Sequence, residues 1–241
     1  MPLPSRERIP RWVRRSLREI QGALARLAFA LRLWKWRTFG RPRRWLETSK
    51  AKARRTREGF FEKHCQGRGL DIGYGGDLVT ETARGWDIEH GDAQCLKGLK
   101  DETFDFVYSS HTLEDMVDPA AALRNWWRVL RPGGRLILYV PHRDLYEKKK
   151  DLPSRWNRSH RHFFLIDRDE EPATIGLVPL LGRALTDVEI VHVKECREGH
   201  TITDPLRHSD GEYSIEAVVR KKRPCGAEMG RNRPQKTPRG A

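Results

Sequence analysis

Three aspartates stand in a glycine-rich stretch where their carboxylates could hold a polar ligand. Asp71 ends a short apolar run, Asp87 follows a second one, and Asp92 lies inside a Gly-Asp-Ala sequence. The turn Gly-Tyr-Gly-Gly at residues 73–76 follows the first run. Glycines directly after a strand let the backbone approach a ligand closely, and a carboxylate at the end of the next strand can accept hydrogen bonds from ribose hydroxyls. The pattern therefore indicates a site for a ligand that contains a ribose.

The segments around these aspartates predict the elements that position them. Three apolar runs predict buried strands and two alternating runs predict a closing strand pair. These runs are residues 68–73, 103–111, 134–141, 187–194 and 211–221. Residues 118–134 predict a helix, because Asp118 can cap its start and a Gly-Gly pair ends it. Strands that alternate with helices imply a mostly parallel sheet, and ligands bind beyond its carboxyl edge, where Asp71, Asp87 and residues 109–111 fall.

The glycine turn does not match two common nucleotide-binding motifs. Gly73 and Gly75 fit the dinucleotide fingerprint G-x-G-x-x-G, but Leu78 stands at its third glycine position. The turn also lacks the Lys-Ser/Thr pair of a phosphate-binding P-loop. We therefore expect neither a nucleotide-dependent dehydrogenase nor a phosphate cradle.

The order of the segments resembles that of class I S-adenosylmethionine-dependent methyltransferases of the methyltransferase-11 type. The run LDIGYGG is followed by WD, by GDA, and then by FDFVYSSHTLEDMVDPAAALRNWWRVLRPGGRLILYVP. The resemblance is strong over residues 67–142, loose over residues 187–221, and absent from both ends of the chain. It implies a Rossmann-like α/β fold with a mostly parallel seven-stranded sheet, helices on both faces, and S-adenosyl-L-methionine as the cofactor.

The resemblance also implies roles for the residues of the glycine-rich stretch. Asp71, Gly73 and Gly75 match the family motif whose turn faces the methionine part of the cofactor. Asp87 matches the acidic residue that holds the ribose hydroxyls. The family usually carries a third spaced glycine where Asp77 stands in this sequence.

Five further residues match the rest of the cofactor site. Asp92 and Ala93 match the pair that meets the adenine, and Ser109, Ser110 and His111 match the turn that lines the methionine side. Asp92 could instead only form a turn, and His111 could simply pack against its neighbours. Because the cofactor's sulfonium already makes its methyl group electrophilic, the protein has mainly to align nucleophile, methyl and sulfur, with at most one base.

The loop after the third buried strand commonly shapes the acceptor pocket in this family. The candidates there are His142, Asp144, Tyr146, His160 and His162. A hydroxyl acceptor needs a base, and histidine titrates in the right range. We expect His160 and His162 to be the catalytic pair, with His142 as a third candidate, although each could be a solvated loop residue. No carboxylate cluster suggests a catalytic metal.

Charge is distributed unevenly along the 241 residues, whose 47 basic and 33 acidic side chains give a net charge of +14. Residues 1–69 carry 20 basic and 5 acidic side chains, a net of +15, whereas residues 70–220 carry 20 and 27, a net of −7. The remaining 21 residues have a net charge of +6. The sequence therefore divides into three predicted parts. These are a basic helical extension over residues 1–66, a methyltransferase domain over residues 67–221, and a disordered basic tail over residues 222–241.

Residues 11–45 predict a long basic helix with one apolar stripe, because apolar side chains recur every three or four residues. The stripe comprises Val13, Leu17, Ile20, Leu24, Leu27, Leu31 and Trp34. Three interpretations stay open. The stripe could pack on the domain or on a second copy, the helix could lie on an anionic membrane surface, or it could bind nucleic acid. An Arg-rich start is also typical of an organelle transit peptide.

The cysteines indicate the cellular setting, and the turn after the second buried strand indicates the type of acceptor atom. Four cysteines without a CxxC pair or zinc spacing indicate a reducing cytoplasmic setting, and no apolar run reaches the ~18 residues of a membrane span. Residues 109–111 lack the Asn/Asp-Pro-Pro-Tyr/Phe signature of amino-group methylation, which favours oxygen or carbon as acceptor. We therefore expect a cytoplasmic or membrane-peripheral methyltransferase with a small-molecule or glycan-linked acceptor. The alternatives are an RNA methyltransferase and a non-catalytic cofactor-binding scaffold.

Overall fold

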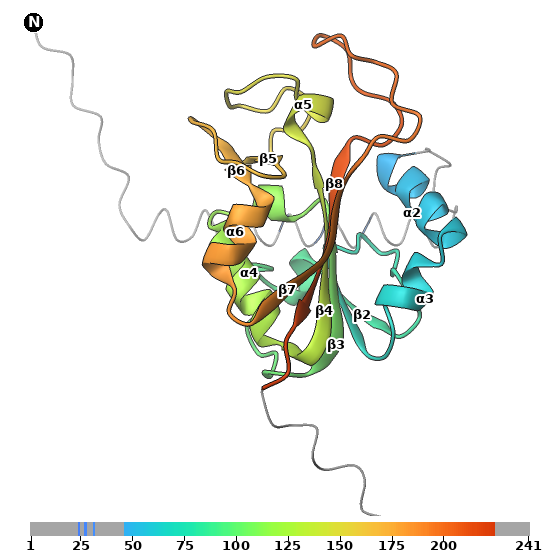
Figure 1. Ribbon diagram of the computed structural model, residues 1–241, viewed down its shortest axis with the longest axis vertical. Helices are drawn as coiled ribbons and strands as arrows, with labels where there is room; N and C mark the ends of the chain where they lie inside the picture. Colours follow the sequence, from blue (N-terminus) through green and yellow to red (C-terminus); the bar gives the residue numbers. More distant parts are fainter. Residues whose placement is uncertain (1–23, 25–26, 28–30, 32–45, 225–241) are drawn as a thin grey trace, which may run out of the picture.

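The computed structural model describes residues 46–224 and three positions upstream of them, Leu24, Leu27 and Leu31 (Figure 1). Within the described chain, the main sheet has the strand order β2-β1-β3-β4-β8-β7. Its strands are β1 (Gly69–Ile72), β2 (Ala83–Trp86), β3 (Phe104–Ser110), β4 (Leu130–Pro141), β7 (Val188–Cys196) and β8 (Ser214–Lys221). Strands β1 to β4 run parallel, and β8 runs antiparallel to both β4 and β7. The carboxyl ends of the four parallel strands therefore share one edge.

The Rossmann-like α/β fold is confirmed, but the expected seven strands are wrong for the described residues, whose main sheet has six. After β2 the chain forms the 3-10 turn η1 (Ile88–His90) and irregular turns until β3 begins. This segment supplies no strand, so β2 stays at the edge of the sheet. Two further strands, β5 (Phe163–Leu165) and β6 (Thr174–Gly176), form a separate two-stranded sheet.

Helices cover both faces of the main sheet (Figure 1). One face carries α4 (Pro119–Arg128) and α6 (Leu177–Ala184), and the other carries α2 (Glu47–Arg57) and α3 (Phe60–His64). Two short elements, η2 (Leu113–Asp115) and α5 (Arg143–Tyr146), follow the carboxyl ends of β3 and β4. Among the described residues, no helix is both long enough and apolar enough to cross a membrane.

The predicted helix over residues 118–134 is present but shorter. The Ala121 backbone N–H donates to Asp118 Oδ1 at 2.9 Å, so Asp118 caps α4 as expected. The helix ends at Arg128, before the predicted Gly-Gly stop, and β4 begins at Leu130. The Pro-Gly-Gly sequence lies in an irregular part of the ladder between β3 and β4. Leu130 pairs with Phe104 and Arg135 with Phe106, so the extra residues of β4 between these pairs have no partner on β3.

The basic segment before β1 folds onto the sheet through buried ion pairs. Arg54 and Arg55 of α2 are buried, and both contact Glu216 of β8, at 2.9 Å and 2.6 Å. Arg54 also pairs with Glu212 at 2.9 Å, and Arg55 lies over the ring of Tyr139 at 4.2 Å. Part of the predicted extension, helix α2, thus packs on one face of the main sheet. The proposed domain boundary at residue 66 stays a prediction.

The apolar stripe of residues 11–45 lies almost entirely outside the described residues. Its described members, Leu24, Leu27 and Leu31, are helical and 57% to 60% exposed. The three interpretations of the segment stay predictions, as does the tail of residues 222–241, of which residues 222–224 are described.

The ion-pair network under α2 generates a stability prediction. Glu216→Gln leaves two buried guanidinium groups without their shared carboxylate, and breaking a buried pair costs about 3–5 kcal/mol. We expect the free energy of unfolding, measured by urea denaturation, to fall by that amount. Glu189→Gln is the matched control, because Glu189 of β7 forms an exposed pair with Arg220 of β8, worth about 0–1 kcal/mol. Equal losses in the two variants would contradict the structural role of the network.

Candidate active site

The turn after β1 places backbone groups at the carboxyl edge of the sheet. Gly73 has φ +75°, and a Cβ built on it would lie 2.0 Å from Thr112 Oγ1. Its N–H donates to the Trp86 carbonyl at 2.8 Å, which ties the turn to the end of β2. Gly75 has φ +57°, and a Cβ built there would meet no atom within 4 Å. Glycine is therefore required at the first position by close approach, whereas at the second a side chain would meet open space and glycine is favoured by the positive φ.

Asp71 stabilises the loop that contains this turn. Its side chain is buried, and its Oδ2 accepts a hydrogen bond from the Val79 backbone N–H at 2.7 Å. Burial raises the pKa of Asp71 to about 7. The carboxyl group therefore holds the two ends of the loop between β1 and β2 together. Its match to the cofactor motif stays a prediction.

Asp87 joins the ends of β1 and β2. Its Oδ2 accepts from the Gly75 backbone N–H at 3.0 Å, and its Oδ1 accepts from the Ile88 N–H at 2.8 Å. The residue is half-buried and also starts η1. A carboxylate has about four lone-pair sites, so both oxygens retain acceptor capacity for a ligand at this edge.

Asp92 and Ala93 lie beyond β2, next to α4. Asp92 is exposed, and its Oδ1 accepts from the Gln94 backbone N–H at 2.8 Å, so it stabilises a turn. The Ala93 carbonyl accepts from Trp126 Nε1 at 2.8 Å, which fixes the backbone of this segment against the core. Their assignment to the adenine stays a prediction.

The carboxyl end of β3 carries Ser109, Ser110 and His111. Ser109 is buried, and its Oγ has no hydrogen-bond partner among the described residues. His111 has φ +53°, which turns the chain sharply out of the strand. A buried hydroxyl without a partner costs free energy unless a ligand or water satisfies it. The hydroxyl group of Ser109 is thus left unsatisfied by the described chain.

His111 is held between two buried carboxylates. Its Nε2 lies 2.8 Å from Glu47 Oε2 of α2, and its Nδ1 lies 3.4 Å from Glu114 Oε1 of η2. Burial lowers the pKa of His111, but the charge of Glu47 and the contacts with Glu114 more than compensate and raise it to about 10. His111 is therefore an imidazolium at neutral pH and cannot act there as a base.

Sequence reasoning missed Glu47, which lies 64 residues before its partner His111. The only local signal is that Glu47 is the single acidic residue among the basic residues of positions 43–57. An isolated acid in a basic helix is a weak signal, because nothing in the helix shows which strand it will meet.

A series of alternating acids and histidines continues from His111 away from the glycine turn. Glu114 is buried, and its Oε1 lies 3.8 Å from His160 Nε2. His160 is also buried, and its Nδ1 lies 3.2 Å from Glu147 Oε1. Glu147 is fixed by Ser154 Oγ and by the Arg155 backbone N–H, the latter at 3.1 Å. The Glu147 carboxylate therefore orients the His160 ring.

The other predicted catalytic residues do not join this series. His142 lies after β4 with its Nε2 3.3 Å from Glu195 of β7, and burial lowers its pKa. Burial also lowers the pKa of His162, whose buried Nε2 has no partner among the described residues. Tyr146 lies near the series, with its ring centroid 5.6 Å from that of His160. The structure thus sets His160 apart from His142 and His162, whose catalytic roles stay predictions.

Comparison with known proteins gives matches to the part of the chain that includes the carboxyl ends of β1, β2 and β3. The family model described as "Methyltransferase domain" matches residues 62–138. A protein of Mycolicibacterium smegmatis, named "Probable S-adenosylmethionine-dependent methyltransferase", is 30% identical over 114 residues, which cover 37% of this chain and 44% of that protein. A demethylmenaquinone methyltransferase of Mycolicibacterium paratuberculosis is 44% identical over 63 residues, which cover 26% of this chain and 27% of that protein. These matches confirm the resemblance to S-adenosylmethionine-dependent methyltransferases.

The matches extend over part of each protein. The chain spans less than half the length of these two curated relatives. Among solved structures, a SAM-dependent methyltransferase from Methanosarcina mazei has a TM-score of 0.45 and 18% identity, with 67% of this chain and 96% of that chain covered. Glu47 lies outside the segment that the family model matches.

The pairing of His111 with Glu47 generates a pH prediction. A group whose pKa is raised on folding stabilises the fold fully below its unfolded pKa, about 6.5, and loses that contribution as pH rises through the folded value, about 10. The wild-type chain should therefore lose stability between these two pH values. Glu47→Gln should shift the His111 ring titration, followed by NMR, to lower pH and remove most of this loss. An unchanged titration midpoint would contradict the assignment.

Proposed function

Because residues 62–138 belong to the methyltransferase domain family, we propose that this chain transfers the methyl group of S-adenosylmethionine to an acceptor at the carboxyl edge of its sheet. Bound there, the cofactor supplies an electrophilic methyl group. The observation that carries the proposal is the junction of β1 and β2, where Asp87 accepts from Gly75 and keeps acceptor capacity for ribose hydroxyls.

The side chains at this edge fit the cofactor. In the turn of residues 73–76, open space surrounds the position of a Cβ at Gly75. Ser109 offers a buried hydroxyl that has no partner in the described chain. Asp87 offers a half-buried carboxylate that can accept hydrogen bonds from a diol. Positive-φ glycines, a carboxylate and an unsatisfied hydroxyl thus lie together at the ends of three adjacent strands.

His160 is the best-placed base for an acceptor hydroxyl. Its Nδ1–H donates to Glu147, so its Nε2 is the nitrogen that can accept a proton. The Nε2 atom lies 3.8 Å from Glu114 Oε1, which is beyond hydrogen-bond distance. An acceptor hydroxyl near Nε2 would pass its proton to the imidazole as its oxygen takes the methyl group. His111 is already protonated between Glu47 and Glu114 and would not serve as this base.

An oxygen acceptor on a small molecule or a glycan suits this arrangement better than a base nitrogen. The turn of residues 109–111 lacks the Asn/Asp-Pro-Pro-Tyr/Phe signature of amino-group methylation. A histidine oriented by a carboxylate is suited to remove a hydroxyl proton. The acceptor itself can be found by offering candidate extracts and labelled S-adenosylmethionine to the protein and identifying the labelled product by mass.

The ribose assignment generates the first test. Asp87→Asn keeps an oxygen for one of the two backbone contacts but removes the charge, and hydrogen bonds to a charged group are worth about 1.5–3 kcal/mol. We expect S-adenosylhomocysteine to bind about 10- to 100-fold more weakly in calorimetry. Asp101→Asn, at an exposed ion pair with Arg128, should leave the dissociation constant unchanged. An unaltered affinity in the Asp87 variant would refute the assignment.

The proton-transfer role generates a second test. His160→Ala should lower turnover about 10²- to 10⁴-fold with the acceptor found by screening, while S-adenosylhomocysteine still binds. Glu147→Gln should lower turnover less and shift the pH profile, because Glu147 orients the His160 ring but does not itself accept the proton. His162→Ala is the matched comparison on the same segment. If His160→Ala keeps full turnover, His160 is only a packed residue.

A further inference from the structure

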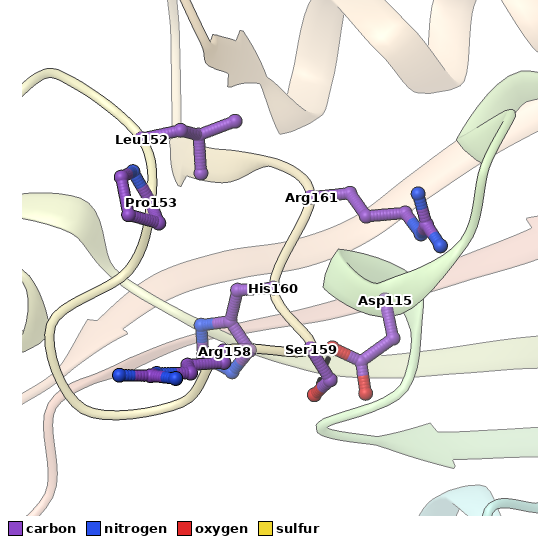
Figure 2. A pocket seen from close by; sticks show the side chains of 7 residues that line it. All are labelled: Asp115, Leu152, Pro153, Arg158, Ser159, His160 and Arg161. Carbon is purple, nitrogen blue, oxygen red and sulfur yellow. Dashed lines mark hydrogen bonds between the residues drawn. The ribbon is translucent and has the colours of Figure 1, made fainter. Parts of the chain in front are cut away.

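A pocket of about 680 Å³ opens beside His160, in the loop that follows α5 (Figure 2). Its wall is formed by one turn of η2 and by two parts of the loop. The lining residues are Asp115, Leu152, Pro153, Arg158, Ser159, His160 and Arg161. Because His160 is the proposed base, this pocket is where an acceptor would lie next to it.

Arg158 and Arg161 are exposed, and neither guanidinium forms an ion pair or side-chain hydrogen bond with a residue of the described chain. The other cations of this loop are occupied. Lys148 Nζ donates to the Asp204 carbonyl at 3.1 Å, and Lys150 pairs with Glu170 at 3.1 Å. Lys149 and Arg155 donate to the carbonyls of Pro153 and Pro205. The guanidinium groups of Arg158 and Arg161 lack such partners and point to opposite sides of the pocket (Figure 2), in a region whose net charge is −7.

Asp115 is the single acidic side chain of the lining, so the two arginines leave a net positive charge. Its Oδ1 accepts from Ser159 Oγ at 2.9 Å. Burial and the neighbouring Glu114 raise the pKa of Asp115, which weakens it as a partner for the arginines.

The opposite part of the lining is apolar. Leu152 is 40% exposed, and Pro153 continues the same surface (Figure 2). A ligand that fills the pocket would therefore meet guanidinium groups and a hydrocarbon surface together. Guanidinium groups match the geometry of phosphate and carboxylate oxygens.

We propose that this pocket binds the anionic end of the acceptor, a phosphate or carboxylate group joined to an apolar portion, through the guanidinium group of Arg158 or of Arg161. The inference rests on the proposed function and adds the chemical class of its substrate. His160 connects the pocket to the cofactor edge through Glu114 and His111, by contacts of 3.8 Å and 3.4 Å. Anchoring the anion at either arginine would thus leave the remainder of the acceptor beside the base.

The test measures binding of simple probes to the full chain with S-adenosylhomocysteine present. Phenyl phosphate, benzoate and benzyl alcohol share an apolar ring and differ in the anionic group. We expect the phosphate or the carboxylate probe to bind, and the neutral alcohol to bind at least tenfold more weakly. Arg158→Gln/Arg161→Gln should weaken the anionic probe at least tenfold without unfolding the protein, because neither side chain has a partner to lose.

The matched control is Lys100→Gln/Arg124→Gln, which removes two exposed charges away from the pocket. It should leave probe affinity unchanged. Equal losses in the two double variants, equal binding of benzyl alcohol, or no binding of either anion at millimolar concentration would each overturn the inference. Cofactor affinity, measured in the same samples, separates the two proposals. Failure of the probes with intact cofactor binding refutes the anion site alone, whereas failure of cofactor binding refutes the proposed function.

Discussion

The carboxylate of Glu47 is the constraint on which the arrangement of the site depends. It accepts hydrogen bonds from His111 Nε2, Tyr139 OH and Ser214 Oγ, and from the Tyr213 backbone N–H. Burial opposes its charge, but these donors lower its pKa, so it stays ionised. One side chain of α2 thereby fixes the turn after β3 against β4 and β8. A buried carboxylate with four donors is favourable only while all of them are in place.

The same arrangement connects the proposed cofactor edge with the proposed acceptor side. From Glu47, alternating carboxylates and imidazoles run through His111, Glu114 and His160 to Glu147. Its two histidines differ in role because their partners differ. His111 lies between two acids that keep it protonated, whereas His160 has one hydrogen-bonded acid and an Nε2 without a hydrogen bond. A charged imidazole is thus held at the end of β3, and the imidazole proposed as the base lies at the pocket.

Local signals in the sequence predicted the parts of the structure that local interactions determine. The Asp118 cap, the apolar runs of the strands and the glycine turn each depend on neighbouring residues. The helix stop at Gly133 was wrong, because ladder pairing with β3 already begins at Leu130, and the expected seventh strand was wrong, because the segment after β2 forms η1 and turns. Glu47 and Glu147 were not found, since their value lies in long-range contacts with His111 and with His160, which pattern alone does not reveal.

The central claim is that a methyl donor binds where β1, β2 and β3 end, on a turn fixed by a helix that precedes the family's domain. A crystal structure of the complete chain with S-adenosylhomocysteine tests it most directly. The account predicts the ribose hydroxyls within hydrogen-bond distance of Asp87 and the His111–Glu47 contact intact. A ligand bound away from this edge, or a His111 released from Glu47 in the complex, would contradict it.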